Sequence, residues 1–109
     1  MTEIAPTPKP PYYAVIFTSM RTEGDDDNAV MADKMVDLAA SQPGYLGIES
    51  VRSGLGITVS YWSSLEDIKA WHRNAEHQAA QKMGYQKWYQ TFKVRVCRVE
   101  RDYDFDRAA

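Results

Sequence analysis

The sequence predicts a ferredoxin-like α+β domain, in which both helices cover one face of an antiparallel sheet. Its 109 residues fit one domain. Apolar runs and segments of helical spacing alternate along the chain in the order strand, helix, strand, strand, helix, strand. A short turn with two glycines joins the middle strands into a hairpin. We therefore expect a Pro-rich arm at 1–11, a single domain at 12–103 and a tail at 104–109.

The arm contains four closely spaced prolines and is either a disordered tail or an extended segment that packs on a partner subunit. From Tyr12 to Met20 the chain is almost continuously apolar and rich in β-branched and aromatic residues. Such a strand is buried on both faces and therefore central in its sheet. Because the helices cover only one of these faces, we expect a second sheet on the other, in a symmetric dimer.

The first helix begins after Gly24, where Asp25–Asn28 supplies N-cap oxygens and negative charge for the helix dipole. The alternative, a metal site in the acidic run, is disfavoured because adjacent side chains do not converge on one ion. Helical spacing places one apolar stripe along this helix: Met31, Met35, Leu38 and Ala39. Gln42-Pro43-Gly44 ends the helix.

The second strand spans 45–52, and its alternation predicts two faces. One carries Leu46, Ile48, Ser50 and Arg52, and the other Tyr45, Glu49 and Val51. After the turn at 53–56, the third strand at 57–62 has a face that bears Thr58, Ser60 and Trp62. Two hydroxyls beside a tryptophan suit either a cavity wall or a solvated sheet face.

The second helix opens with a capping box made by Ser63 and Glu66, or by Ser64 and Asp67 in the competing register. One side of the helix then carries Leu65, Ile68, Trp71 and His72, and we expect Asn74 to loosen it. The last strand, at 90–103, alternates an apolar set with a polar one: Phe92, Val94 and Val96 against Lys93, Arg95 and Cys97. Its length exceeds that of a common strand, which favours a second pairing partner, for example from another subunit.

Composition excludes several classes of function. A net charge of -2 gives no electrostatic reason to bind nucleic acid or an anionic membrane. No apolar run is long enough for a membrane span, and the N-terminus lacks the pattern of a signal peptide, so a cytoplasmic location is expected. The one cysteine, Cys97, is predicted to be a small buried thiol.

Two histidines of the second helix are candidates for chemistry. His72 and Glu76 lie four residues apart, but His77 points elsewhere on a regular helix, so we expect no metal site. Each histidine is either a structural imidazole bonded to backbone or a general base for a phenolic proton. Arg52 is either solvated or positioned to hold the anion that such a base creates.

The chain resembles the antibiotic biosynthesis monooxygenase family over about Tyr12 to Tyr103. The resemblance rests on Gln42-Pro43-Gly44-Tyr45-Leu46-Gly47, on Glu49-Ser50 with Arg52, on Thr58-Val59-Ser60-Tyr61-Trp62-Ser63, and on the helix that carries Trp71, Asn74-Ala75-Glu76-His77, Ala80-Gln81 and later Gly84 and Trp88-Tyr89. It implies a homodimeric α+β barrel. It also implies one of two activities: cofactor-free oxygenation of polyphenolic or quinol-like substrates, or haem degradation.

Haem degradation is disfavoured by comparison with the family pattern. Trp71 matches the family's tryptophan, but Gln81 takes the place of the histidine that binds iron, and the first strand offers Phe17, Thr18 and Ser19 without an asparagine. We therefore predict a homodimeric monooxygenase that acts on an apolar or aromatic small molecule without a cofactor. The predicted catalytic residues are His77 and His72, and the predicted substrate-binding residues are Trp71, Trp62, Arg52 and Tyr89. A non-catalytic ligand-binding dimer is the alternative.

Overall fold

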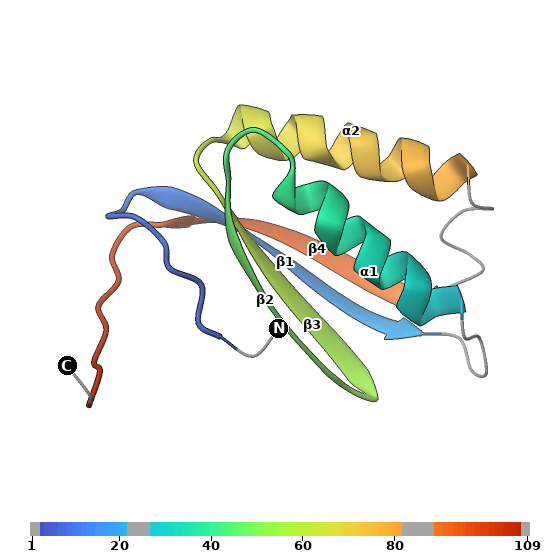
Figure 1. Ribbon diagram of the computed structural model, residues 1–109, viewed down its shortest axis with the longest axis horizontal. Coiled ribbons are helices and arrows are strands. Elements are labelled where there is room, and N and C mark those ends of the chain that lie inside the picture. Colours follow the sequence, from blue (N-terminus) through green and yellow to red (C-terminus); the bar gives the residue numbers. More distant parts are fainter. Residues whose placement is uncertain (1–2, 22–26, 82–88, 108–109) are drawn as a thin grey trace.

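The computed structural model describes residues 3–21, 27–81 and 89–107; the side chains at 27–32 and 76–81, within the helices, lie outside this description. The elements follow the predicted order: β1 (Tyr12–Arg21), α1 (Asp27–Ala40), β2 (Tyr45–Ser53), β3 (Leu55–Trp62), α2 (Leu65–Gln81) and β4 (Tyr89–Val99). Both helices lie on the same side of the sheet (Figure 1), which confirms the ferredoxin-like fold.

The sheet has the order β2-β3-β1-β4, and every neighbouring pair is antiparallel. The prediction that the first strand is central is confirmed, because β1 pairs with β3 on one side and with β4 on the other. Val15 lies opposite Ser60 of β3 and Val96 of β4. The odd-numbered side chains of β1 therefore face the helices, and the even-numbered ones face the opposite side, which we call the open face.

The β2–β3 hairpin turns at Gly54, whose φ of 81° is the left-handed conformation that glycine adopts without strain. At its other end the register shifts between Tyr45 and Gly47. This β-bulge moves Tyr45 onto the helix side, where its ring packs edge-on against Trp62 at 5.8 Å. The prediction that Tyr45 shares a face with Glu49 is therefore wrong, because the extra residue resets the alternation.

Helix α2 begins at the second of the two predicted caps. The Ser64 hydroxyl accepts a hydrogen bond from the Asp67 amide at 3.1 Å and donates to the Asp67 carboxylate at 2.8 Å. The helix runs without a break from Leu65 to Gln81, so the expected loosening at Asn74 is not observed. Asparagine costs a helix no more than about 0.7 kcal/mol relative to alanine, and burial of Ile68 on the same helix offsets a penalty of that size.

The core lies between the helices and the helix side of the sheet. It contains Val15, Ala39, Trp62 and Ile68, with Trp62 completely buried. The two central strands and the two helices thus contribute one residue each to this cluster. The described helices offer no segment with the length and hydropathy that crossing a membrane would require.

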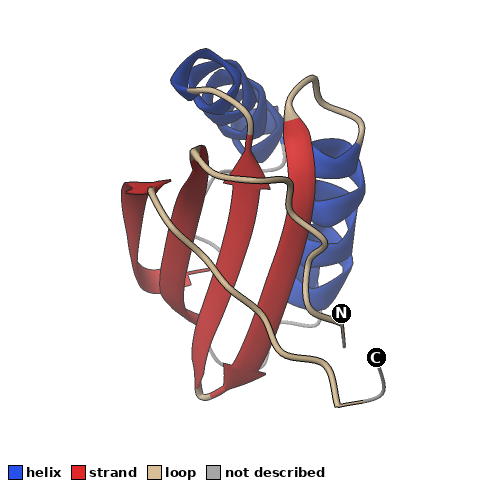
Figure 2. Ribbon diagram, turned by 90° about the vertical axis from the view of Figure 1, so that its left-hand side faces the viewer, coloured by secondary structure: helices blue, strands red, loops and turns tan. Residues whose placement is uncertain are grey.

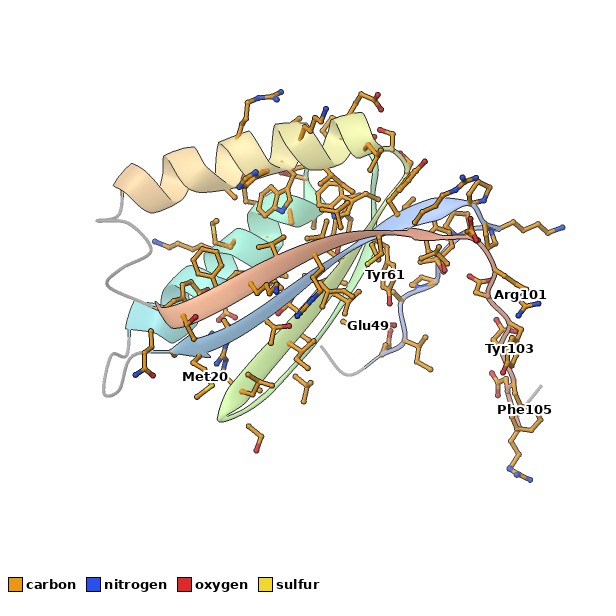
Figure 3. The ribbon with its side chains drawn as sticks, turned by 180° about the vertical axis from the view of Figure 1, so that it is seen from behind. Met20, Glu49, Tyr61, Arg101, Tyr103 and Phe105 are labelled. Carbon is orange, nitrogen blue, oxygen red and sulfur yellow. The ribbon has the colours of Figure 1, made fainter. Side chains whose placement is uncertain are left out.

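Both terminal segments lie on the side of the sheet away from the helices (Figures 1 and 2). The N-terminal arm bonds to its own sheet: the Ala5 amide donates to Glu49 at 2.9 Å, and the Thr7 hydroxyl donates to Tyr12 at 3.0 Å. Regular pairing in β4 ends at Val99, four residues before the predicted end of the strand. Beyond it the tail extends away from the sheet and exposes Tyr103 and Phe105 (Figure 3).

Cys97 is exposed, so the prediction of a buried thiol is wrong. The residue lies opposite Ala14, on the open face of β4. In the described sheet β4 is an edge strand that pairs with β1, and residues on both of its faces are exposed. A strand that reads as buried from its β-branched residues is therefore exposed by its place in the sheet.

Candidate functional site

A pocket of about 480 Å³ lies between the sheet and the two helices. Its floor is the helix side of the sheet, where four hydroxyl side chains follow the strands: Ser19, Ser50, Thr58 and Ser60. The same floor has an apolar part, from Val15 and Phe17 of β1 and from Phe92, Val94 and Val96 of β4, and the helices form the opposite wall. The three β4 residues face the helices but keep 39–51% exposure, so the pocket is open along β4. An apolar cavity with a few polar groups is the usual form of a small-molecule site.

The two tryptophans predicted to bind substrate occupy different positions. Trp71 projects from α2 into the pocket wall. Trp62 lies behind it: the two rings stack at 6.0 Å with an interplanar angle of 21°, and the Trp62 indole N–H donates to Ser60 at 2.9 Å. Trp62 therefore holds Trp71 in place from the core, and the structure does not bring it to the pocket surface.

His72 follows Trp71 on α2 and also lines the pocket, at an exposed position. A histidine at the rim of an apolar site can exchange a proton with a bound ligand on one side and with water on the other. The side chain of His77, the other predicted base, lies outside the described residues. Of the two predicted bases, His72 is therefore the one that the structure places at the pocket.

Arg52 is held across the hairpin. Its Nη2 donates to the Ser19 hydroxyl at 2.5 Å, and its Nη1 lies 3.4 Å from the carbonyl oxygens of Ser19 and Gly54. Burial, followed by the neighbouring charge of Arg21, lowers the pKa of Arg52. Hydrogen bonds thus hold the guanidinium at the pocket wall, although Arg52 as a whole keeps solvent exposure.

Tyr89 closes the pocket near Arg52. Its ring lies 5.3 Å from that of Phe17 and 5.8 Å from that of Phe92, edge-on to each. Burial raises the pKa of the Tyr89 hydroxyl, and the charges of Arg21 and Arg52 partly offset this. The neutral phenol is therefore the form of Tyr89 present near neutral pH.

Four of the residues predicted from the sequence line one pocket: Arg52, Trp71, His72 and Tyr89. The sequence reasoning missed Ser19, Arg21 and Gly56, which surround the Arg52 guanidinium. Alternation along β1 would have placed Ser19 and Arg21 on the side of Val15. No local pattern links Ser19 to Arg52, 33 residues away, because the sheet register alone joins them.

The described residues contain no cluster that could hold a metal ion, and the family comparison places a glutamine at the haem-ligand position. Within the described parts of the chain, no three His, Cys, Asp or Glu side chains gather around one point. The family resemblance would place the axial ligand of haem at position 81, and a glutamine is not among the residues that usually hold haem iron.

Comparison with known proteins identifies the family. The sequence pattern described as antibiotic biosynthesis monooxygenase matches residues 11–83. The chain is 52% identical over 100 residues to the uncharacterised protein YqjZ of Bacillus subtilis, an alignment that covers 90% of this chain and 88% of that protein.

Solved structures share the fold at low sequence identity. A candidate antibiotic biosynthesis monooxygenase from Chloroflexus aurantiacus superposes with a TM-score of 0.61 at 20% identity, over 85% of this chain and 97% of that one. A protein of unknown function from Nitrosomonas europaea superposes with a TM-score of 0.64 at 13% identity, over 88% of this chain and 96% of that one. By the sequence pattern that covers most of its length, this chain belongs to the antibiotic biosynthesis monooxygenase family.

Proposed function

We propose that the protein is a monooxygenase that oxidises an aromatic, quinol-like small molecule without a bound cofactor. The observation that supports the proposal is the pocket itself, in which an apolar wall with the Trp71 ring meets a histidine and a fixed guanidinium. The wall binds the rings of the substrate, His72 accepts a proton and Arg52 stabilises the resulting anion. Membership of the family is consistent with this division of roles.

The reaction draws its electrons from the substrate. His72 removes the phenolic proton, or the ring CH₂ proton of the keto tautomer as in anthrone, and the carbanion-like anion forms a C–O bond with O₂ to give a hydroperoxide. The O–O bond then breaks with loss of water, which leaves a carbonyl. One oxygen atom enters the product, the other leaves as water, and no external reductant is needed. An apolar pocket excludes water and so strengthens the interaction of Arg52 with the anion.

Oxygen uptake with a panel of hydroquinones and anthrones tests the proposal. We expect uptake above the buffer rate, and a fall of about 10²- to 10⁴-fold in His72→Ala, the range that general bases usually contribute. Arg73→Ala, which changes the neighbouring exposed residue of α2, is the matched control and should keep the rate. Uptake equal to buffer across the panel, with ligands still bound by calorimetry, would indicate the non-catalytic ligand-binding protein instead.

We also propose that the protein forms a homodimer through the open face of its sheet. Three apolar side chains on this face remain exposed: Val51 at 66%, Leu55 at 48% and Ile57 at 37%. The C-terminal tail projects on the same side with Tyr103 and Phe105 exposed (Figure 3), in the position to lie against a second copy. Contiguous exposed apolar groups of this kind mark interaction surfaces.

The molar mass in solution tests the dimer. Light scattering after size-exclusion chromatography should give twice the chain mass for the wild type and a monomer for Val51→Glu, because a buried unpaired carboxylate destabilises an interface. Leu65→Glu, at a similarly exposed apolar position on α2, should remain dimeric. A wild-type monomer at micromolar concentration would contradict the proposal.

A further inference from the structure

The pocket has an unusual distribution of charge. Four of its described lining residues carry basic groups: Arg21, Arg52, Lys69 and His72. None of its described lining residues is an aspartate or glutamate. Two guanidinium groups in a partly buried, apolar cavity repel each other, and the repulsion is stronger than in water because the dielectric constant is lower. The pocket is therefore electrostatically ready for an anion.

Gly56 is what allows Arg52 to reach this position. Across the sheet, Gly56 of β3 lies between Arg52 of β2 and Ser19 of β1. The Arg52 side chain passes over the glycine to bond to Ser19, and a Cβ atom at position 56 would overlap its guanidinium group. The absence of a side chain at one position thus fixes the charge of another at the pocket wall.

Arg21 supplies the second guanidinium and is not fully satisfied. It lies two residues beyond Ser19 on β1, on the same side of the strand, and pairs with Tyr89 across a bulge. Its Nε is buried, and no described residue supplies a hydrogen-bond acceptor for it. Buried donors without an acceptor are rare in folded proteins because each loses its hydration without replacement. An acceptor brought by a ligand would satisfy it.

The neighbouring groups indicate what the rest of such a ligand is like. Phe17, Tyr89 and Phe92 form an aromatic cluster beside the guanidinium groups, and Trp71 lines the same pocket from α2. Aromatic rings prefer stacked or edge-on ring partners at such distances. The combination fits a flat ring system with one negatively charged oxygen group, since a guanidinium binds such oxygens through paired N–H donors.

We infer that Arg52 and Arg21 form an anion-binding subsite, and that the pocket selects aromatic molecules bearing a carboxylate or an ionised phenol over their neutral analogues. The inference rests on the proposed function only in taking this pocket as the ligand site. It concerns binding and does not require turnover.

Calorimetric titration with 2-naphthoate and with its neutral analogue 2-naphthamide, near neutral pH, tests the inference. Wild-type protein should bind the carboxylate at least about tenfold more tightly than the amide, as expected for a hydrogen-bonded charge. Arg52→Gln should weaken naphthoate binding roughly 10- to 100-fold and leave naphthamide binding within about twofold. Gly56→Ala, which displaces the guanidinium without removing its charge, should reduce the preference in the same direction.

Arg95→Gln is the matched control, because it removes an arginine from the open side of β4, opposite Ile16, and should leave the preference unchanged. Circular dichroism of each variant verifies folding, and Arg52→Lys, which keeps the charge but loses the paired donors, gives a second reading if Arg52→Gln unfolds. Equal binding of acid and amide by the wild type would overturn the inference and leave the proposed oxygenase standing. Binding of neither, with oxygen uptake present, would overturn the inference alone; binding of neither without uptake would overturn both.

Discussion

The two faces of the sheet are built from alternate residues of the same strands, but their polar groups differ in how completely they are satisfied. On the open face, Glu49 accepts hydrogen bonds from the Ala5 amide at 2.9 Å and the Tyr61 hydroxyl at 2.7 Å, and Tyr12 donates to Asp102 at 2.5 Å. On the helix side, Arg52 donates to neutral oxygens, and the Arg21 Nε has no acceptor among the described residues. The first network includes two carboxylates, Glu49 and Asp102, whereas the described residues around the two arginines include none.

This difference indicates which polar groups hold the fold together and which are available for a ligand. The open-face network joins both terminal segments to the sheet, and Glu49 and Tyr61 point toward each other near the arm (Figure 3). Its bonds connect residues up to 90 positions apart. On the helix side, Arg52 of β2 reaches across β3 to Ser19 of β1, and both arginines line the cavity. We therefore assign structure to the first face and binding to the second.

Trp62→Ala removes the buried ring that packs behind Trp71 on the helix side, and we expect it to lower the stability of the fold more than the other changes. Removing a completely buried tryptophan should lower the free energy of unfolding by about 3–5 kcal/mol. The matched change Trp71→Ala removes a partly exposed ring and should cost clearly less stability while weakening ligand binding. Urea unfolding of both variants measures the two losses. Equal losses would contradict the view that Trp62 is the anchor and Trp71 the pocket wall.

Glu49→Ala removes the central acceptor of the hydrogen-bond network on the open face, and we expect an intermediate loss of stability. It leaves the Tyr61 hydroxyl and the Ala5 amide without their acceptor, which costs about 1–3 kcal/mol. Hydrogen exchange by mass spectrometry should show faster exchange in the arm, because the bond that holds Ala5 is lost. Glu66→Ala, at an exposed position of α2, is the control. An arm that exchanges equally fast in both variants would show that Glu49 does not hold it.

The smallest expected effect is a loss of stability at alkaline pH through the open-face tyrosines. Burial, together with the hydrogen bond to Glu49, raises the pKa of Tyr61, and burial with the bond to Asp102 raises that of Tyr12. Folding therefore favours the protonated phenols. Their contribution is complete below the pKa of unfolded tyrosine, about 10, and is lost as the pH rises through the folded values.

Denaturant midpoints measured from pH 8 upward should fall above about pH 10, and the fall should be shallower in Tyr61→Phe. Tyr103→Phe changes a tyrosine that is 94% exposed and should leave the slope unchanged. An identical slope in wild type and Tyr61→Phe would remove this residue from the explanation.

The local pattern of the sequence predicted the order of the elements and the central place of β1. It also predicted which face of its strand or helix carries Arg52, Trp71 and His72. These follow from periods of two and 3.6 residues, which short segments contain by themselves. The same pattern failed at Tyr45, Asn74 and Cys97. A bulge, the packing of α2 and the edge position of β4 decided these three, and each depends on neighbours remote in the chain.

The binding of Arg52 to Ser19 over Gly56 belongs to the tertiary structure alone. Three strands contribute one residue each, and only their register brings the three together. The sequence determined which side chains alternate onto the helix side, because the geometry of a strand fixes that locally. The sheet determined that two arginines meet there without a carboxylate among the described lining residues, because pairing between distant segments sets every lateral neighbour.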